Sequence, residues 1–291
     1  MIDYRIWLAF VILVGYSLGD ILAKKIVVKL NYALSAMVIT GIGIVPFLLA
    51  APFAGAQGIT LYSILLSAVA GLFYGGGFIM LYKALSTEQT TNTMALSEFF
   101  KGCLVVIGIF AFGEALATLQ YGGILMIFLG ALLIITTEKL KINRKLVYAL
   151  SGFVMWAVLW TLIAVAVKDS NSYLYEGLIL NLVAFLACLA YSAYSSRRLV
   201  KGGNMVRFLK RELRGHTLNL SLLIGLAVGI GGLVFCYLIL YKMLAAGAAI
   251  IALTPVTVAI ASRKMYLDKL TVVQLLGLLI MVIGALALSL G

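Results

Sequence analysis

Residues 218–241 read LNLSLLIGLAVGIGGLVFCYLILY, a continuous stretch that contains no charged side chain. A helix needs about 20 apolar residues to cross the hydrocarbon core of a bilayer, so this stretch is long enough to span one. It is apolar around its whole circumference, which is typical of a helix surrounded by lipid and by other helices. The stretch therefore predicts a membrane-spanning helix, and it decides the class of fold.

The rest of the chain has the same character. Of the 291 residues, 64% are hydrophobic and only 11% are charged, whereas soluble domains carry about 25% charged residues. This composition excludes an ordinary water-soluble globule and predicts an all-α membrane protein. Ten stretches are candidate transmembrane helices: 4–26, 32–51, 61–82, 89–112, 118–137, 146–167, 174–194, 218–241, 245–263 and 271–290.

The positive charges are distributed unevenly over the loops between these stretches. Lys and Arg total 22 against 10 Asp and Glu, which gives a net charge of +12. Most basic residues lie in the loops after the first, third, fifth, seventh and ninth stretches, above all in 195–217. Because basic loops stay in the cytoplasm, we predict a multi-pass plasma-membrane protein with both termini outside. No soluble face combines basic and aromatic residues, so no nucleic-acid partner is expected.

The two halves of the chain resemble each other. The sequence LYKAL at 81–85 matches LYKML at 240–244. Further matches, in order and at one spacing, are Glu114 with Asp268, Ala117 with Thr271, Gln120 with Gln274, Gly123 with Gly277, and Gly130 with Gly284. We therefore predict two five-helix repeats, residues 1–142 and 143–291. Because five is odd, the second repeat enters the membrane in the opposite sense, and inverted repeats favour alternating access around a midplane site.

This pattern resembles the EamA family of the drug/metabolite transporter (DMT) superfamily, over nearly the whole chain. The residues that carry the resemblance are Thr254-Pro255, Asp268, Leu270-Thr271, Gln274, Gly277 and Gly284 in the second half, and Ala95-Leu96, Glu114, Leu116, Gln120, Gly123 and Gly130 in the first. The resemblance implies a ten-helix bundle that carries small metabolites, often amino acids. It also places the family's mid-helix aromatic residues on Tyr16 and Trp160. The chain departs from the family pattern at Glu98, which replaces a proline.

An acid–base pair lies deep in the fourth stretch. Glu98 and Lys101 are three residues apart, which puts them on one helix face near mid-bilayer. Ionisable groups at that depth are costly unless they are paired or hydrated. The pair either packs the bundle or lines a wet cavity, where Glu98 could exchange protons or the pair could clamp a zwitterion. With the neighbouring Ser97 it forms the candidate binding set, and we expect Glu98→Gln to abolish transport while the protein stays folded.

Aromatic residues at mid-span depth are candidate walls of the same cavity, with core packing as the alternative. We expect Tyr16, Trp160 and Tyr237 to contact the substrate. Pro255 removes one backbone hydrogen bond near the midplane. It is therefore a candidate hinge, and a static kink is the alternative.

Two other features predict contacts at helix surfaces and helix ends. Gly71-x-x-x-Gly75 and Gly225-x-x-x-Gly229 have the spacing of small residues that lets two helices approach closely. Glu114 and Asp268 precede the last stretch of the first and second half, where an acidic residue near a helix start compensates the dipole and caps the helix.

The sequence favours a secondary transporter of a small polar or zwitterionic, amino-acid-like metabolite, with protons as a candidate coupling ion. The expected partners are this substrate and membrane lipids, and the assembly is a monomer or a dimer. An enzyme is not expected, because the single histidine, His216, lies in a basic loop and the cysteines lack metal-ligand spacing. For the same reason no cofactor or metal is expected. A non-coupled channel, or a translocator of lipids or hydrophobic compounds with the same fold, is the alternative.

Overall fold

A computed structural model describes residues 4–53, 58–86, 100–136, 144–199, 212–266 and 271–290, and these residues contain helices but no strand. In chain order the elements are α1 (Tyr4–Leu30), α2 (Tyr32–Gly43), α3 (Val45–Ala50), the 3-10 turn η1 (Ala51–Phe53), α4 (Leu61–Leu85), α6 (Phe100–Phe112), α7 (Thr118–Thr136), α8 (Arg144–Ser170), α9 (Tyr173–Leu199), α11 (His216–Leu240), α12 (Leu244–Ile251), α13 (Thr254–Tyr266) and α14 (Val272–Leu290).

Six described segments are long and apolar enough to cross a membrane: Tyr32–Phe53, Leu61–Leu85, Val147–Ser170, Tyr173–Ser195, His216–Leu240 and Leu244–Ala261. Many large apolar side chains point away from the bundle, among them Leu65 and Leu72 on α4 and Leu125 on α7. An apolar exterior of this extent suits contact with lipid rather than with water. The chain is an all-α membrane protein, which confirms the class predicted from its composition.

The helix starts follow from local sequence. Asn31 lies just before α2, and its side-chain oxygen accepts a hydrogen bond from the backbone N–H of Ala33 at 3.1 Å. Thr60 and Ser63 form a capping box at the start of α4, in which each side chain accepts from the other residue's backbone N–H. Such residues satisfy N–H groups that have no partner inside the helix.

Two of the expected stretches are interrupted by proline. The second breaks at Ile44, between α2 and α3, and Pro46 lies in the first turn of α3. The ninth breaks between α12 and α13, and Pro255 lies in the first turn of α13. A proline has no N–H to bond to the preceding turn, and the hydroxyl of Thr254 donates to the carbonyl of Ile251 at 2.6 Å instead. Pro255 thus lies next to a break in its helix, and its role as a hinge stays a prediction.

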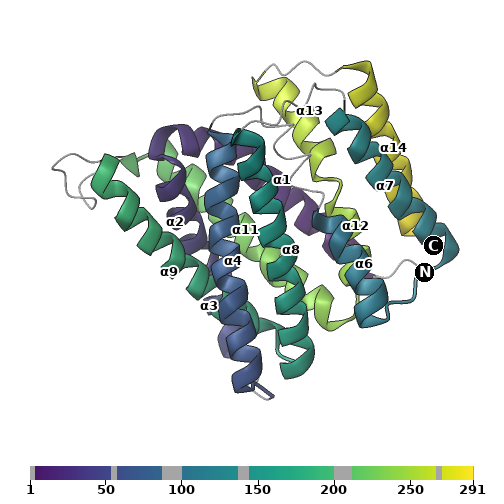
Figure 1. Cartoon of the computed structure of the whole chain (residues 1–291), viewed down its shortest axis with the longest axis horizontal. Helices are drawn as coiled ribbons and strands as arrows, with labels where there is room; N and C mark the ends of the chain where they lie inside the picture. Colours follow the sequence, from purple (N-terminus) through teal and green to yellow (C-terminus); the bar gives the residue numbers. More distant parts are fainter. Residues whose placement is uncertain are drawn as a thin grey trace.

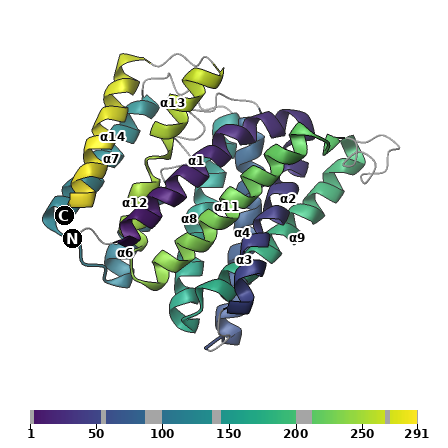
Figure 2. The ribbon, with the colours of Figure 1, turned by 180° about the vertical axis from the view of Figure 1, so that it is seen from behind.

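The helices pack in matched pairs across the two halves of the chain. The contact of α1 with α11 matches that of α4 with α8, and the contact of α2 with α11 matches that of α4 with α9. In addition, α6 packs on α12 and α7 packs on α14. The pair of α7 and α14 lies at one edge of the bundle (Figure 1). Figure 2 shows the other side of the bundle, where α1 crosses α11.

The two glycine motifs lie where helices touch. A methyl group on Gly71 of α4 would lie 2.6 Å from the carbonyl oxygen of Leu180 in α9, and one on Gly75 would lie 2.8 Å from that of Ala184. Gly225 of α11 meets the side chain of Ile42 in α2 in the same way. The prediction that these motifs allow close helix contact is confirmed.

Both ends of the chain lie at the same end of the bundle, the end where α7 starts (Figure 1). The breaks between α8 and α9 and between α11 and α12 face this end as well (Figure 1). The residues of these breaks line the candidate site described next.

Candidate functional site

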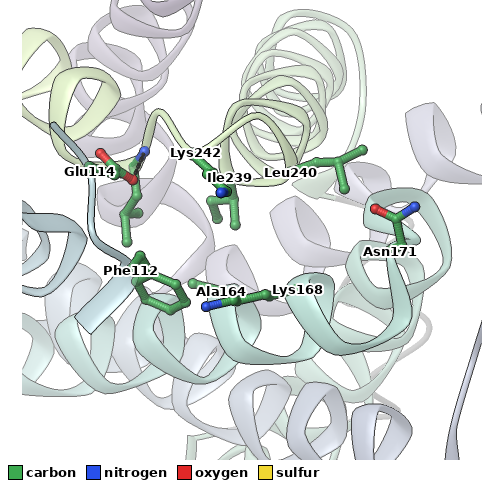
Figure 3. Close-up of a pocket in the computed structure, with 9 residues that line it drawn as sticks. Phe112, Glu114, Ala164, Lys168, Asn171, Ile239, Leu240 and Lys242 are labelled. Carbon is green, nitrogen blue, oxygen red and sulfur yellow. Dashed lines mark hydrogen bonds between the residues drawn. The ribbon is translucent and has the colours of Figure 1, made fainter.

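A pocket of about 230 Å³ opens at that end of the bundle, between the two halves of the chain. The first half contributes Phe112, the last residue of α6, and Glu114 in the loop after it. The second half supplies the other lining residues: Ala164, Lys168, Asn171, Ile239, Leu240, Lys242 and Leu244 (Figure 3). A second hollow of about 380 Å³ adjoins it and shares Asn171 and Leu240.

Glu114 joins the two halves at this pocket. Its Oε1 accepts a hydrogen bond from the backbone N–H of Leu244 (Figure 3), and its Oε2 accepts one from that of Ala245, each at 2.7 Å. The side chain is 7% exposed. Burial raises the pKa of the Glu114 carboxyl above its ordinary value of 4.5, and the two backbone N–H groups oppose the rise. The carboxylate thus caps α12, whose N-terminal dipole favours negative charge.

The prediction that Glu114 caps the helix that follows it, α7, is wrong. That helix is capped by Gln120, whose Oε1 accepts from the backbone N–H of Ala117 at 2.9 Å. Sequence spacing indicated a cap at the nearest helix start, whereas the fold brings the start of α12 closer to this carboxylate.

Two lysines extend over the same pocket. The Lys168 ammonium lies 5.3 Å from the centre of the Phe112 ring. Lys242 follows α11 and has a φ of 57°, in the left-handed region that residues other than glycine rarely adopt. Both side chains are exposed. Figure 3 shows the Lys168 side chain directed toward Phe112 and Lys242 beside Ile239 on the opposite wall. The pocket therefore combines the positive charge of two lysines with a mainly apolar lining.

A buried aromatic cluster lies between the halves. Trp160 of α8 is 4% exposed, and its ring meets Phe235 of α11 at 4.5 Å between centroids and Tyr74 of α4 at 6.4 Å. Tyr74 in turn meets Phe78 at 4.9 Å. Edge-on contacts of this kind stabilise aromatic pairs beyond the burial of their area. The cluster ties α4 of the first half to α8 and α11 of the second.

Tyr16 of α1 lies near this cluster. Its ring packs against Gly231 of α11, one turn before Phe235, and a methyl group on Gly231 would lie 2.6 Å from the ring. The Tyr16 hydroxyl is buried and has no hydrogen-bond partner among the described residues. Buried polar groups almost always find a partner, so this hydroxyl is a candidate contact for a bound molecule.

The other predicted site residues are placed differently. Tyr237 packs against Tyr173 and Tyr241, at 5.4 and 4.7 Å between ring centroids. Ser97 and Glu98 lie outside the described residues. So does the side chain of Lys101, although its backbone belongs to α6.

Sequence reasoning missed Glu176, in the first turn of α9. Its side chain is fully buried, its Oε2 accepts from the hydroxyl of Ser67 in α4 at 2.6 Å, and its Oε1 has no hydrogen-bond partner among the described residues. The signal was a lone carboxylate inside an apolar stretch.

Comparison with known proteins establishes the fold and no more. No family model matches the chain, and no curated protein matches it. A solved structure described only as "Crystal structure of protein" is similar, with a TM-score of 0.70 and 16% identity over 100% of this chain and 98% of that one. At that identity the likeness concerns the fold alone, so the function has to be argued from the residues.

Proposed function

We propose that the chain is a secondary transporter of the EamA type, with ten transmembrane helices in two inverted repeats, residues 1–142 and 143–291. In this proposal it moves a small polar or zwitterionic, amino-acid-like metabolite by alternating access. The substrate passes between the halves, where the pocket around Lys168 and Lys242, the Tyr16 hydroxyl and the aromatic cluster around Trp160 lie. Membrane lipids surround the bundle.

The observation that carries the proposal is the matched packing of the two halves. Under the repeat, α1 corresponds to α8 and α4 corresponds to α11, so the contact of α1 with α11 is the counterpart of the contact of α8 with α4. The contacts of α2 with α11 and of α9 with α4 are counterparts in the same way. Such pairing is what a twofold axis in the membrane plane requires, and inverted repeats of this kind underlie alternating access.

Local details at equivalent positions support the same repeat. Gln120 Oε1 accepts from the N–H of Ala117 at 2.9 Å, and its counterpart Gln274 Oε1 accepts from the N–H of Thr271 at 2.8 Å. The glycine contacts between α7 and α14 are also reciprocal: Gly130 approaches the carbonyl of Gly277, and Gly284 approaches that of Gly123.

Counterflow in proteoliposomes tests the proposal. Vesicles that contain the purified protein are loaded with a mixture of the twenty amino acids, and the amounts that leave are measured by mass spectrometry. We expect one amino acid, or a chemically related few, to leave several-fold faster than from protein-free vesicles, and to exchange with the same compound outside. If every compound leaves at the protein-free rate, the substrate class is wrong.

Replacing Tyr16 by phenylalanine separates a binding role from a packing role. The change removes only a buried hydroxyl that has no partner among the described residues, so we expect the free energy of unfolding to stay the same or rise by up to about 1 kcal/mol. If the hydroxyl binds substrate, we expect the transport rate to fall about tenfold. Losing one hydrogen bond to the substrate costs about 1.4 kcal/mol of binding free energy, and that energy corresponds to a factor of ten. The control is Tyr62→Phe, whose hydroxyl lies on an exposed residue of α4. Equal transport by both variants would remove Tyr16 from the binding site.

A further inference from the structure

The 230 Å³ pocket lined by Glu114, Lys168 and Lys242 carries an excess of positive charge. Both oxygens of Glu114 already accept hydrogen bonds from the N-terminus of α12. Lys168 lies over the Phe112 ring, and neither it nor Lys242 has a carboxylate partner among the described residues. The Glu114 carboxylate, which lines the same pocket, is therefore engaged with backbone N–H groups.

The backbone of Lys242 has an unfavourable, left-handed conformation. A left-handed backbone conformation is unfavourable for a residue with a side chain, and such strain is typical of functional sites. The matching residue of the first half, Lys83, stays inside α4, with its ammonium 4.1 Å from the centre of the Tyr148 ring. One lysine of the matched pair is thus packed over an aromatic ring, and the other is exposed at the pocket.

Apart from Asn171, the remaining walls of the pocket are apolar. Phe112, Ile239, Leu240 and Leu244 line it, and its volume is about 230 Å³. Pockets for drug-sized ligands hold about 300–1,000 Å³, so this one fits a smaller molecule with a short apolar body.

We propose that this pocket binds the carboxylate of a small organic acid between Lys168 and Lys242, with the apolar part of the molecule against Phe112. An ammonium group on the ligand is not required, because Glu114 is committed to α12. This inference rests on the proposed function and deepens it, because it names the chemical group by which the transporter selects its substrate. Lysine ammonium groups are common ligands of such anions.

Three molecules that share a 3-methylbutyl chain test the inference: 4-methylpentanoate, leucine and 3-methylbutylamine. They carry a carboxylate alone, both charges, and an ammonium alone. We expect the first two to raise the midpoint of thermal unfolding of the purified protein and the amine to leave it unchanged. Lys168→Gln and Lys242→Gln are each expected to weaken binding of 4-methylpentanoate at least tenfold. Lys29→Gln is the control, since it removes an exposed charge at the far end of α1.

Three results would overturn the inference: stabilisation by the amine equal to that by the acid, no stabilisation by either carboxylate at 10 times the concentration of the protein or above, and unchanged affinity in both pocket variants. The proposed function is judged separately by counterflow. Binding that depends on both lysines without any transport contradicts the transporter and keeps the site. Transport that is unaffected by either substitution contradicts the site and keeps the transporter.

Discussion

Glu114→Ala is expected to destabilise the folded protein by about 3 kcal/mol or more. Each of its two hydrogen bonds joins a carboxylate to a backbone N–H of α12, and a hydrogen bond to a charged group contributes about 1.5–3 kcal/mol. The change also leaves the start of α12 uncapped at the contact between the two halves. Thermal or denaturant unfolding of the purified protein measures the loss.

Glu114→Gln is the matched variant, because an amide keeps one acceptor oxygen and so one of the two hydrogen bonds. It should lose about half as much stability as Glu114→Ala. Equal stability of the wild type and both variants would mean that the cap contributes nothing to folding.

The same residue makes stability depend on pH in a defined direction. Burial raises the pKa of Glu114 in the folded state above 4.5, so its protonated form is favoured by folding. Its contribution is complete below the unfolded pKa and is lost as the pH rises through the folded one. Glu114→Gln should therefore flatten the decline in stability in the pH range just above 4.5. A decline of the same slope in both proteins would assign it to other groups.

Gly130→Leu is expected to separate α7 from α14. A side chain at Gly130 would run into the backbone of α14, because its Cβ alone would lie 2.6 Å from Met281 Cγ and 3.0 Å from the Met281 nitrogen. Overpacking of a tight contact costs about 1–3 kcal/mol, and backbone cannot move aside as a flexible side chain can. We expect a loss at or beyond the upper end of that range, measured by thermal unfolding.

Gly122→Leu is the control on the same helix. A methyl group at Gly122 would meet no atom within 4 Å, and leucine has a higher helix propensity than glycine by up to about 1 kcal/mol. This variant should match the wild type or exceed it slightly. If both variants lost the same stability, the effect would come from adding leucine to α7 and not from its contact with α14.

Much of the fold could be read from the sequence, because the bilayer imposes length and composition on each helix. The expected stretch 118–137 is close to α7, Thr118–Thr136, and 271–290 is close to α14, Val272–Leu290. The glycine spacing also located two helix contacts. The break in the second stretch, at Pro46, was not predicted, because the residues on both sides of it are apolar and read as one continuous helix.

The site was harder to predict, because its residues meet only in the folded chain. Lys168 and Lys242 lie at the ends of two different apolar stretches, and only the fold brings the ends of α8 and α11 together at one pocket. Glu114 was assigned to the nearest helix start, since local spacing carries no information about α12. Tyr16 was singled out as an aromatic wall, and the lack of a partner for its hydroxyl became visible only once its neighbours were placed.

The chain begins and ends at the same end of the bundle (Figure 1). Unpaired backbone groups are costly in hydrocarbon, so a linker between the two termini has to run through water, and here it can do so on one side of the membrane. A circularly permuted protein, with a flexible linker from the last residue to the first, therefore needs no additional crossing. Reporter domains fused to either terminus should also face the same compartment.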